Sequence, residues 1–158
     1  MFEKKIKYTD WDGNTREETF RFNLTQTEML EIETEVPGGL QNYLTEIGEK
    51  VDGKKIMGFV KMFISKSYGE KDTDGKRFRK SPEISKAFEE TQAYDELFSE
   101  LVLDADKLVN FIKAVSPDEA LIQKRLDNAN IPAEILNQNG IEVVDTKPKI
   151  VENRSDSK

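Results

Sequence analysis

Residues 2–22 read FEKKIKYTDWDGNTREETFRF, and this stretch decides the class of fold. Phe2, Ile6 and Tyr8 fall on one parity, polar residues fall on the other, and the alternation returns in TFRF after the turn residues DWDGN. Such alternation is typical of β-strands, and Asp, Asn and Gly favour a tight turn between them. We therefore predict a β-hairpin over residues 2–22. A lone hairpin is marginal in water, so its aromatic face must pack on helices or on another chain.

The chain after the hairpin carries helix start and stop signals out to about residue 130. TQTE at residues 25–28 is a capping-box pattern, and Pro37-Gly38-Gly39 ends the helix that it begins. A short second helix is expected from near residue 40, and a third from about 54 to 68. A helical region with a break near 91–92 should begin at 81, and another helix at 104 or 105. The last expected helix runs from 116 to 129. Apolar residues recur at helical spacing within them. We assign the aromatic ones, Tyr94 and Phe98 included, mainly to the core, with the alternative that a minority forms an exposed groove for a partner helix.

The segment SKSYGEKDTDGKRFRKS, residues 65–81, joins two of these helices. We expect a basic loop here, with Gly69 as the left-handed C′ residue of the preceding helix. DTDG resembles the start of a calcium-binding loop, but Arg77, Arg79 and Lys80 stand where further oxygen ligands are needed. A turn is therefore the better interpretation of Asp72-Thr73-Asp74-Gly75.

Composition removes several classes of chemistry. Among 158 residues there is no Cys and no His, which excludes thiolate nucleophiles, His general bases and catalytic triads. We find no catalytic, cofactor-binding or metal-binding motif. The net charge is -7, a field that argues against nucleic acid as a partner. No apolar run approaches the roughly 18–20 residues that span a bilayer, so we expect no membrane partner and a cytoplasmic location.

Together these patterns predict an α+β fold that is mainly α-helical. A single globular domain over residues 1–136 would hold the N-terminal β-hairpin and a bundle of short helices. Residues 137–158 are polar, with two short β-prone pieces, and we expect a flexible C-terminal tail.

Candidate partner-binding residues come from two places. Trp11 stands at the predicted hairpin tip, where an exposed aromatic side chain is a natural contact. The basic segment adds cations interleaved with aromatic residues: Tyr68, Lys76, Arg77, Phe78 and Arg79. We leave open whether these residues bind a partner or only shape the loop.

The chain resembles the tail assembly chaperones of long-tailed, siphovirus-type phages of Gram-positive bacteria. The resemblance spans about residues 5–117, and its most specific pieces are KSYGEK…DGKRF and QAYDELFSEL. The family has no catalytic motif to carry over, so the resemblance implies a protein that is not an enzyme. It matches residues 68–71 and 74–78 of this chain.

The resemblance further implies partners and a place of action. Such chaperones coat the tape measure protein, keep it soluble in the host cytoplasm, help the tail tube protein polymerise, and are absent from the mature virion. Many are also made as a longer frameshifted form, a further partner to expect here. Self-association is left open at this stage.

Two other functions remain as alternatives. The chain could be a structural phage protein of the tail or the head–tail joint, which would stay in the particle. It could also be an acidic DNA-mimic inhibitor of a host enzyme, although its interleaved Lys and Arg argue against this.

Overall fold

The computed structural model describes residues 1–50 and 52–117, and begins with the predicted hairpin. Strand β1 (Phe2–Thr9) pairs antiparallel with β2 (Thr15–Phe22) along its full length, with Phe2 opposite Phe22 and Thr9 opposite Thr15. The turn is held by Asp10, whose carboxylate accepts hydrogen bonds from the backbone N–H groups of residues 12 and 14 at 3.0 and 2.8 Å. Gly13 has a φ of 82°, which explains why glycine stands there.

The segment predicted as a basic loop is a second hairpin, so that prediction is corrected. Strand β3 (Tyr68–Lys71) pairs with β4 (Phe78–Arg79), and β3 also pairs with β2, which gives a four-stranded sheet of order β1-β2-β3-β4. The turn between β3 and β4 is the one predicted for DTDG: the Gly75 N–H donates to the Asp72 carbonyl, and Gly75 has a φ of 72°.

The prediction that Gly69 is a left-handed helix cap is wrong. The preceding helix ends at Ser67 and its C-cap residue Tyr68 is extended, and among the described glycines a positive φ occurs only at residues 13, 38, 39 and 75. Gly69 lies inside β3, and a Cβ built on it would come within 2.7 Å of both the Arg79 carbonyl oxygen and the Phe78 ring. Glycine is needed at this position because a neighbouring strand passes too close for any side chain.

Six helices are described, and side-chain caps begin most of them. Thr25 and Glu28 form the full capping box that the sequence predicted. Asp52, Ser81, Thr91 and Asp104 also accept hydrogen bonds from the first turns of their helices, which satisfies otherwise orphaned N–H groups. The helices are α1 (Gln26–Glu35), α2 (Leu40–Lys50), α3 (Gly53–Ser67), α4 (Pro82–Glu89), α5 (Gln92–Leu103) and α6 (Ala105–Val115).

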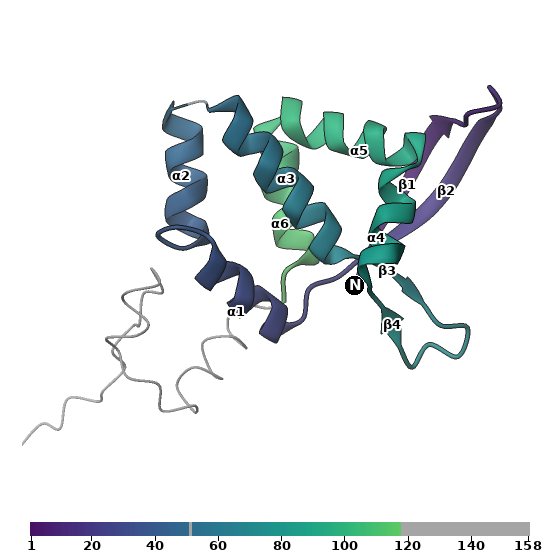
Figure 1. Cartoon of the computed structure of the whole chain (residues 1–158), viewed down its shortest axis with the longest axis horizontal. Coiled ribbons are helices and arrows are strands. Elements are labelled where there is room, and N and C mark those ends of the chain that lie inside the picture. Colours follow the sequence, from purple (N-terminus) through teal and green to yellow (C-terminus); the bar gives the residue numbers. More distant parts are fainter. Residues whose placement is uncertain (51, 118–158) are drawn as a thin grey trace, which may run out of the picture.

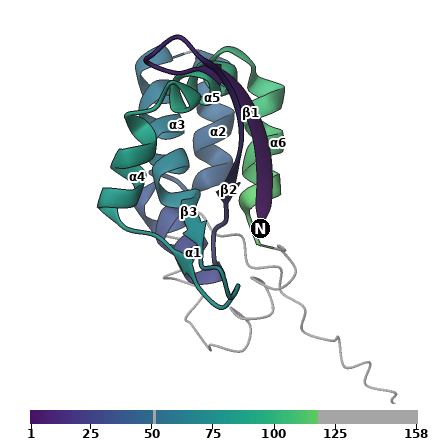
Figure 2. The same cartoon turned by 90° about the vertical axis from the view of Figure 1, so that its right-hand side faces the viewer.

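The helices cover the aromatic face of the sheet. In Figures 1 and 2, α4, α5 and α6 lie beside the strands, while α1 and α2 lie beyond α3, away from the β1–β2 pair. Phe22 is completely buried, and its ring lies within 5.2–6.5 Å of the rings of Phe2, Tyr68, Phe88 and Phe111. The core therefore joins the first hairpin to β3, α4 and α6.

The α+β, mainly helical architecture is confirmed. The break predicted near residues 91–92 and the helix start at 104 or 105 are also confirmed. The helix predicted over 116–129 falls almost wholly outside the described residues, and the tail predicted over 137–158 falls wholly outside them. None of the helices described here is long and apolar enough to cross a membrane.

We expect Gly69→Val to lower the free energy of unfolding by on the order of 1 kcal/mol or more, because the new side chain meets backbone on β4. Gly58→Ala in α3 is the matched control, since a Cβ there meets nothing and helix propensity should raise stability by about 0.5–1 kcal/mol. Urea denaturation of both variants measures the difference. Equal stability of Gly69→Val and the unmodified chain would contradict the close approach.

Candidate partner-binding surfaces

The β3–β4 hairpin presents cations on its outer surface. One carboxylate, Asp72, pairs with two arginines: Arg77 Nε lies 2.8 Å from one oxygen and Arg79 Nε 2.7 Å from the other. The Asp72 side chain is only 13% exposed, whereas those of Arg77 and Arg79 are 78% and 59% exposed. Lys76 is exposed at the turn, and only its backbone N–H is engaged, by Asp74. The cations therefore face solvent, and the carboxylate of Asp72 is covered, whereas Glu70 and Asp74 are exposed.

The base of this hairpin is tied to the start of α1. Lys80 Nζ donates to the Glu28 carboxylate at 2.7 Å and to the Asn23 carbonyl, and it lies 5.8 Å from the centre of the Phe78 ring. Glu28 also completes the capping box with Thr25. Burial opposes ionisation of Glu28, but hydrogen bonds from Lys80 and Thr25, together with the Lys80 charge, outweigh burial and lower the pKa of Glu28.

Trp11 lies on the turn of the first hairpin, as predicted, and its side chain is 76% exposed. Its indole N–H donates to the Glu90 carbonyl at the end of α4, over 3.1 Å. This hydrogen bond places an exposed aromatic ring beside the start of α5. A partly ordered aromatic side chain in this position suits a contact residue, because ordering it on binding costs little.

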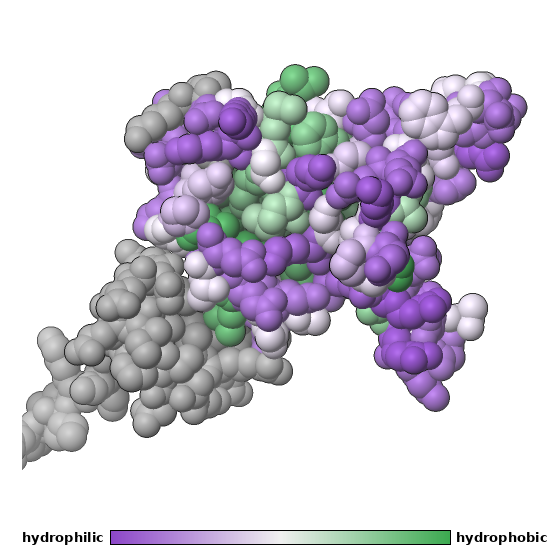
Figure 3. Space-filling model, viewed as in Figure 1, coloured by the Kyte–Doolittle hydropathy of each residue, from purple (hydrophilic) through white to green (hydrophobic). Residues whose placement is uncertain are grey.

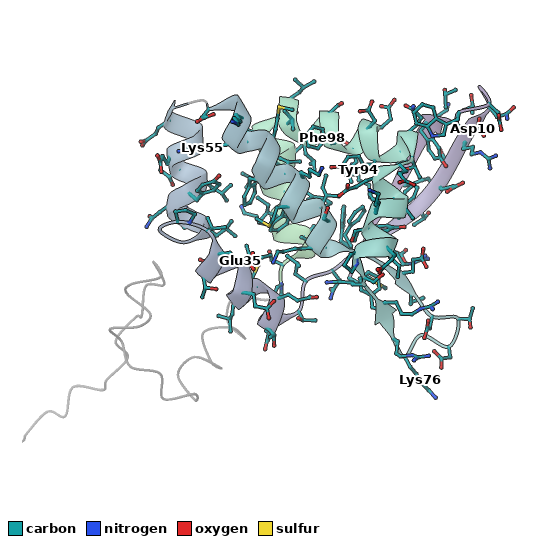
Figure 4. All side chains as sticks on the ribbon, in the orientation of Figure 1. Asp10, Glu35, Lys55, Lys76, Tyr94 and Phe98 are labelled. Atoms are coloured by element: carbon teal, nitrogen blue, oxygen red, sulfur yellow. The ribbon has the colours of Figure 1, made fainter. Side chains whose placement is uncertain are left out.

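Tyr68 differs from the other candidates because its side chain is buried. Its ring stacks on Phe88 with centroids 4.2 Å apart, and it belongs to the core around Phe22. The structure thus brings Lys76, Arg77, Phe78 and Arg79 together on one hairpin and places Trp11 on another. Figure 4 shows Lys76 and Asp10, a neighbour of Trp11, at separate extremities of the molecule.

An apolar stripe runs along α5, and it contains two of the aromatic residues, Tyr94 and Phe98, that the sequence assigned mainly to the core. Tyr94, Phe98 and Val102 are spaced at i, i+4 and i+8, and all three are only partly buried. The rings of Tyr94 and Phe98 stack with centroids 5.8 Å apart. The hydropathy surface shows apolar colour gathered over α3 and α5 (Figure 3). Met57 of α3 is a further exposed apolar side chain, at 49%. The spacing was visible in the sequence, but it could not show that these side chains are only partly buried against the core.

Tyr94 has a second unusual property. Its hydroxyl is buried and has no hydrogen-bond partner. Burial first, and the nearby Glu89 charge second, raise the pKa of Tyr94 to about 12. A buried hydroxyl without a partner is destabilising compared with a phenyl group of the same shape.

A cleft of about 460 Å³ lies between α1, α3 and α4. Its lining is dominated by polar side chains of both charges, including Glu28, Lys66, Lys80 and Glu89, and two of the acids are already bonded to lysines across it. Binding sites for apolar small molecules have mainly apolar walls, so this cleft does not suit them. Among the described residues, no group of three His, Cys, Asp or Glu side chains could hold a metal ion.

The comparisons with known proteins define the class of this protein. The chain matches the family model described as phage tail assembly chaperone over residues 1–156, nearly its whole length. No curated protein and no solved structure matches it. The chain therefore belongs to the phage tail assembly chaperone family, whose members are in general non-enzymatic and have tail-related proteins as partners.

The low pKa of Glu28 predicts a pH-dependent contribution to stability. The carboxylate stabilises the fold fully above its unfolded pKa, near 4.5, and this contribution is lost as the pH falls through the lower folded pKa. Glu28→Gln should therefore be less stable than the unmodified chain at neutral pH, and the gap should narrow in acid. Urea titrations at neutral pH and at about pH 3 measure the gap. Glu31→Gln, on the same helix, is the matched control. A difference in the free energy of unfolding between Glu28→Gln and the unmodified chain that does not change with pH would contradict the prediction.

The raised pKa of Tyr94 predicts a loss of stability in alkali. The unfolded chain ionises this hydroxyl near pH 10, whereas the folded chain holds the proton to about 12, so stability falls between these values. Tyr94→Phe should remove this part of the alkaline loss and should match or exceed the original stability at neutral pH. Thermal melts across the alkaline range, with Tyr43→Phe as the control hydroxyl deletion, test both points. If the melting temperatures of Tyr94→Phe and the unmodified chain fall in parallel as the pH rises, the prediction is wrong.

Proposed function

We propose that this chain binds the tape measure protein of its phage, keeps it soluble, and helps the tail tube protein polymerise around it. Membership of the tail assembly chaperone family supports this proposal, since it implies partners among tail proteins. The finer assignment to the tape measure protein rests on the resemblance of KSYGEK…DGKRF and QAYDELFSEL to chaperones with that client. A longer frameshifted form of the chain is proposed as a further partner.

The observation that carries the proposal is the apolar stripe along α5. A protein that keeps a client soluble needs apolar surface for the client and enough charge to stay soluble itself. Phe98 and Val102, with Met57 of α3, provide apolar surface for the client, and the net charge of -7 keeps the chain itself soluble. Methionine and aromatic side chains adapt to varied apolar partners, which suits a long client with many binding segments.

The first experiment is co-expression with the tape measure protein of the same phage genome. We expect more soluble tape measure protein and its co-purification with this chain. A client that stays insoluble and unbound would overturn the proposal. Mass spectrometry of purified virions tests the place of action: we propose that the chain works in the host cytoplasm and is absent from the particle. Finding it there in stoichiometric amount would instead support a structural role.

The stripe itself is tested by Met57→Glu/Val102→Glu. Carboxylates on this surface should oppose apolar docking and reduce client co-purification by about tenfold, equal to ~1.4 kcal/mol. Met57→Glu alone changes only an exposed position and should fold normally, so it shows whether lost client capture can be separated from a folding defect. Val109→Glu, at an exposed apolar position on α6, is the matched control. Full client capture by the folded double variant would show that the client binds elsewhere.

A further inference from the structure

Charge is strongly segregated along this chain. Residues 82–106, which form α4, α5 and the first turn of α6, contain eight carboxylates and a single lysine. Their net charge of -7 equals that of the whole chain, so the rest of the sequence is neutral in sum. The acidic character of the protein therefore belongs to one group of adjacent helices and not to its entire surface.

The outer face of α5 is the centre of this acidic region. Asp95 and Glu96 are exposed there, and neither makes an ion pair with another described residue. The same face is flanked by the two most exposed large apolar side chains in the described part of the protein, Trp11 at 76% and Leu103 at 85%. Trp11 is held at the start of α5 by its hydrogen bond to the Glu90 carbonyl, and Leu103 is the last residue of the helix.

The β3–β4 hairpin has the complementary surface. Residues 68–79, the whole hairpin, contain four cations and three carboxylates, and one of the carboxylates, Asp72, is covered by Arg77 and Arg79. Lys71 and Lys76 are exposed and form no ion pair among the described residues. The hairpin projects from the body of the molecule, with Lys76 at its end (Figures 1 and 4).

One molecule cannot readily join its own two surfaces. Figure 4 places Lys76 at the end of the projecting hairpin and Asp10, next to Trp11, at another extremity, with α4 between them. Both surfaces are therefore available to other molecules at the same time. A contact between two different patches of identical chains is heterologous, and it repeats from copy to copy unless the rotation closes a ring.

We propose that the β3–β4 hairpin of one molecule docks on the outer face of α5 of a second copy of this chain. Lys76 and Arg77 face Asp95 and Glu96 across the contact, and the Trp11 ring offers its face to a hairpin cation. Cations are attracted to the face of an indole ring more strongly than to other aromatic rings. Leu103 adds apolar area at the far end of the helix.

A second copy of this chain is the partner that charge complementarity favours. The cationic and acidic patches lie on the same chain, so they are always present at equal concentration. Contacts made by exposed charges steer association and weaken as salt screens them over about 10 Å at 0.1 M. The proposed contact is therefore reversible and most evident at low ionic strength. It concerns copies of this chain, and its docking face borders the apolar stripe proposed for the client, because Asp95 lies three residues before Phe98 on α5.

Sedimentation velocity of the full chain tests the contact. The unmodified chain should gain average mass with concentration at low ionic strength and lose that gain in high salt. Lys76→Glu/Arg77→Glu should be monomeric because its hairpin is reversed in charge. Asp95→Lys/Glu96→Lys should also be monomeric, because its docking face is reversed. The control Lys54→Glu/Lys113→Glu makes the same change of net charge as the hairpin variant, at exposed lysines elsewhere, and should still associate.

Mixing the variants distinguishes this contact from general charge repulsion. The hairpin variant keeps an intact α5 face, and the α5 variant keeps an intact hairpin, so an equimolar mixture should associate although neither variant does so alone. The two reversed surfaces also complement each other in charge, so heterodimers and larger mixed species should both form. A chain that combines all four substitutions has both charges exchanged and should associate again. Thermal melts confirm that each variant is folded.

Three results would overturn the proposal: a monomeric unmodified chain at every concentration in low salt, association of either folded charge variant by itself, or no heterodimer in the mixture. Client capture is scored separately with the hairpin variant. Failure of the self-contact therefore leaves the apolar stripe and its client untouched, and loss of client binding alone leaves the self-contact untouched.

Discussion

The packing of Phe22 against four other rings holds this fold together. The ring is fully buried and contacts aromatic residues from β1, the start of β3, α4 and α6, and two of its contacts are edge-to-face. Aromatic pairs contribute about 0.5–1.5 kcal/mol each beyond the area they bury. The first hairpin gains its stability from these contacts, and the helices gain a platform, so neither part is independent of the other.

The same cluster explains why the second hairpin exists. Phe22 lies opposite Tyr68 across the β2–β3 pair, so the residue that fills the core also aligns the strand that follows α3. The chain leaves the helix directly into a strand, with Tyr68 serving as the helix C-cap and as the first strand residue. The position of the basic hairpin is thereby fixed from within the core.

Local signals were sufficient to predict much of this structure. Thr25-Gln26-Thr27-Glu28, Ser81-Pro82 and Asp104 mark helix starts through hydrogen bonds within three residues, and alternation marks the first hairpin. The second hairpin was missed because β3 depends on β2, some forty-five residues earlier in the sequence, and its own four residues carry no clear alternation. Gly69 was assigned to a helix cap for the same reason, since the strand that excludes a side chain there comes from residues 78–79.

The candidate surfaces were predicted less completely than the fold. Trp11, Lys76 and Arg77 are exposed where the sequence placed them, because turn residues reach solvent in almost any packing. Tyr94 and Phe98 were assigned mainly to the core but are only partly buried against it, since periodicity identifies the side of a helix but not the extent of its cover. Exposed carboxylates on the helices were expected, but an overall charge of -7 does not by itself show that the excess of acid lies within residues 82–106.

The crowding at Gly69 has a consequence for how this protein can diversify. A side chain at Gly69 would collide with β4, whereas a Cβ at Gly75 in the turn meets no other atom within 4 Å, and only its φ of 72° favours glycine there. Substitutions and short insertions at the tip are therefore compatible with an unchanged body, in the way that loops vary on a rigid scaffold. A phage lineage could exchange the tip to follow a changing partner while the anchoring residues stay the same.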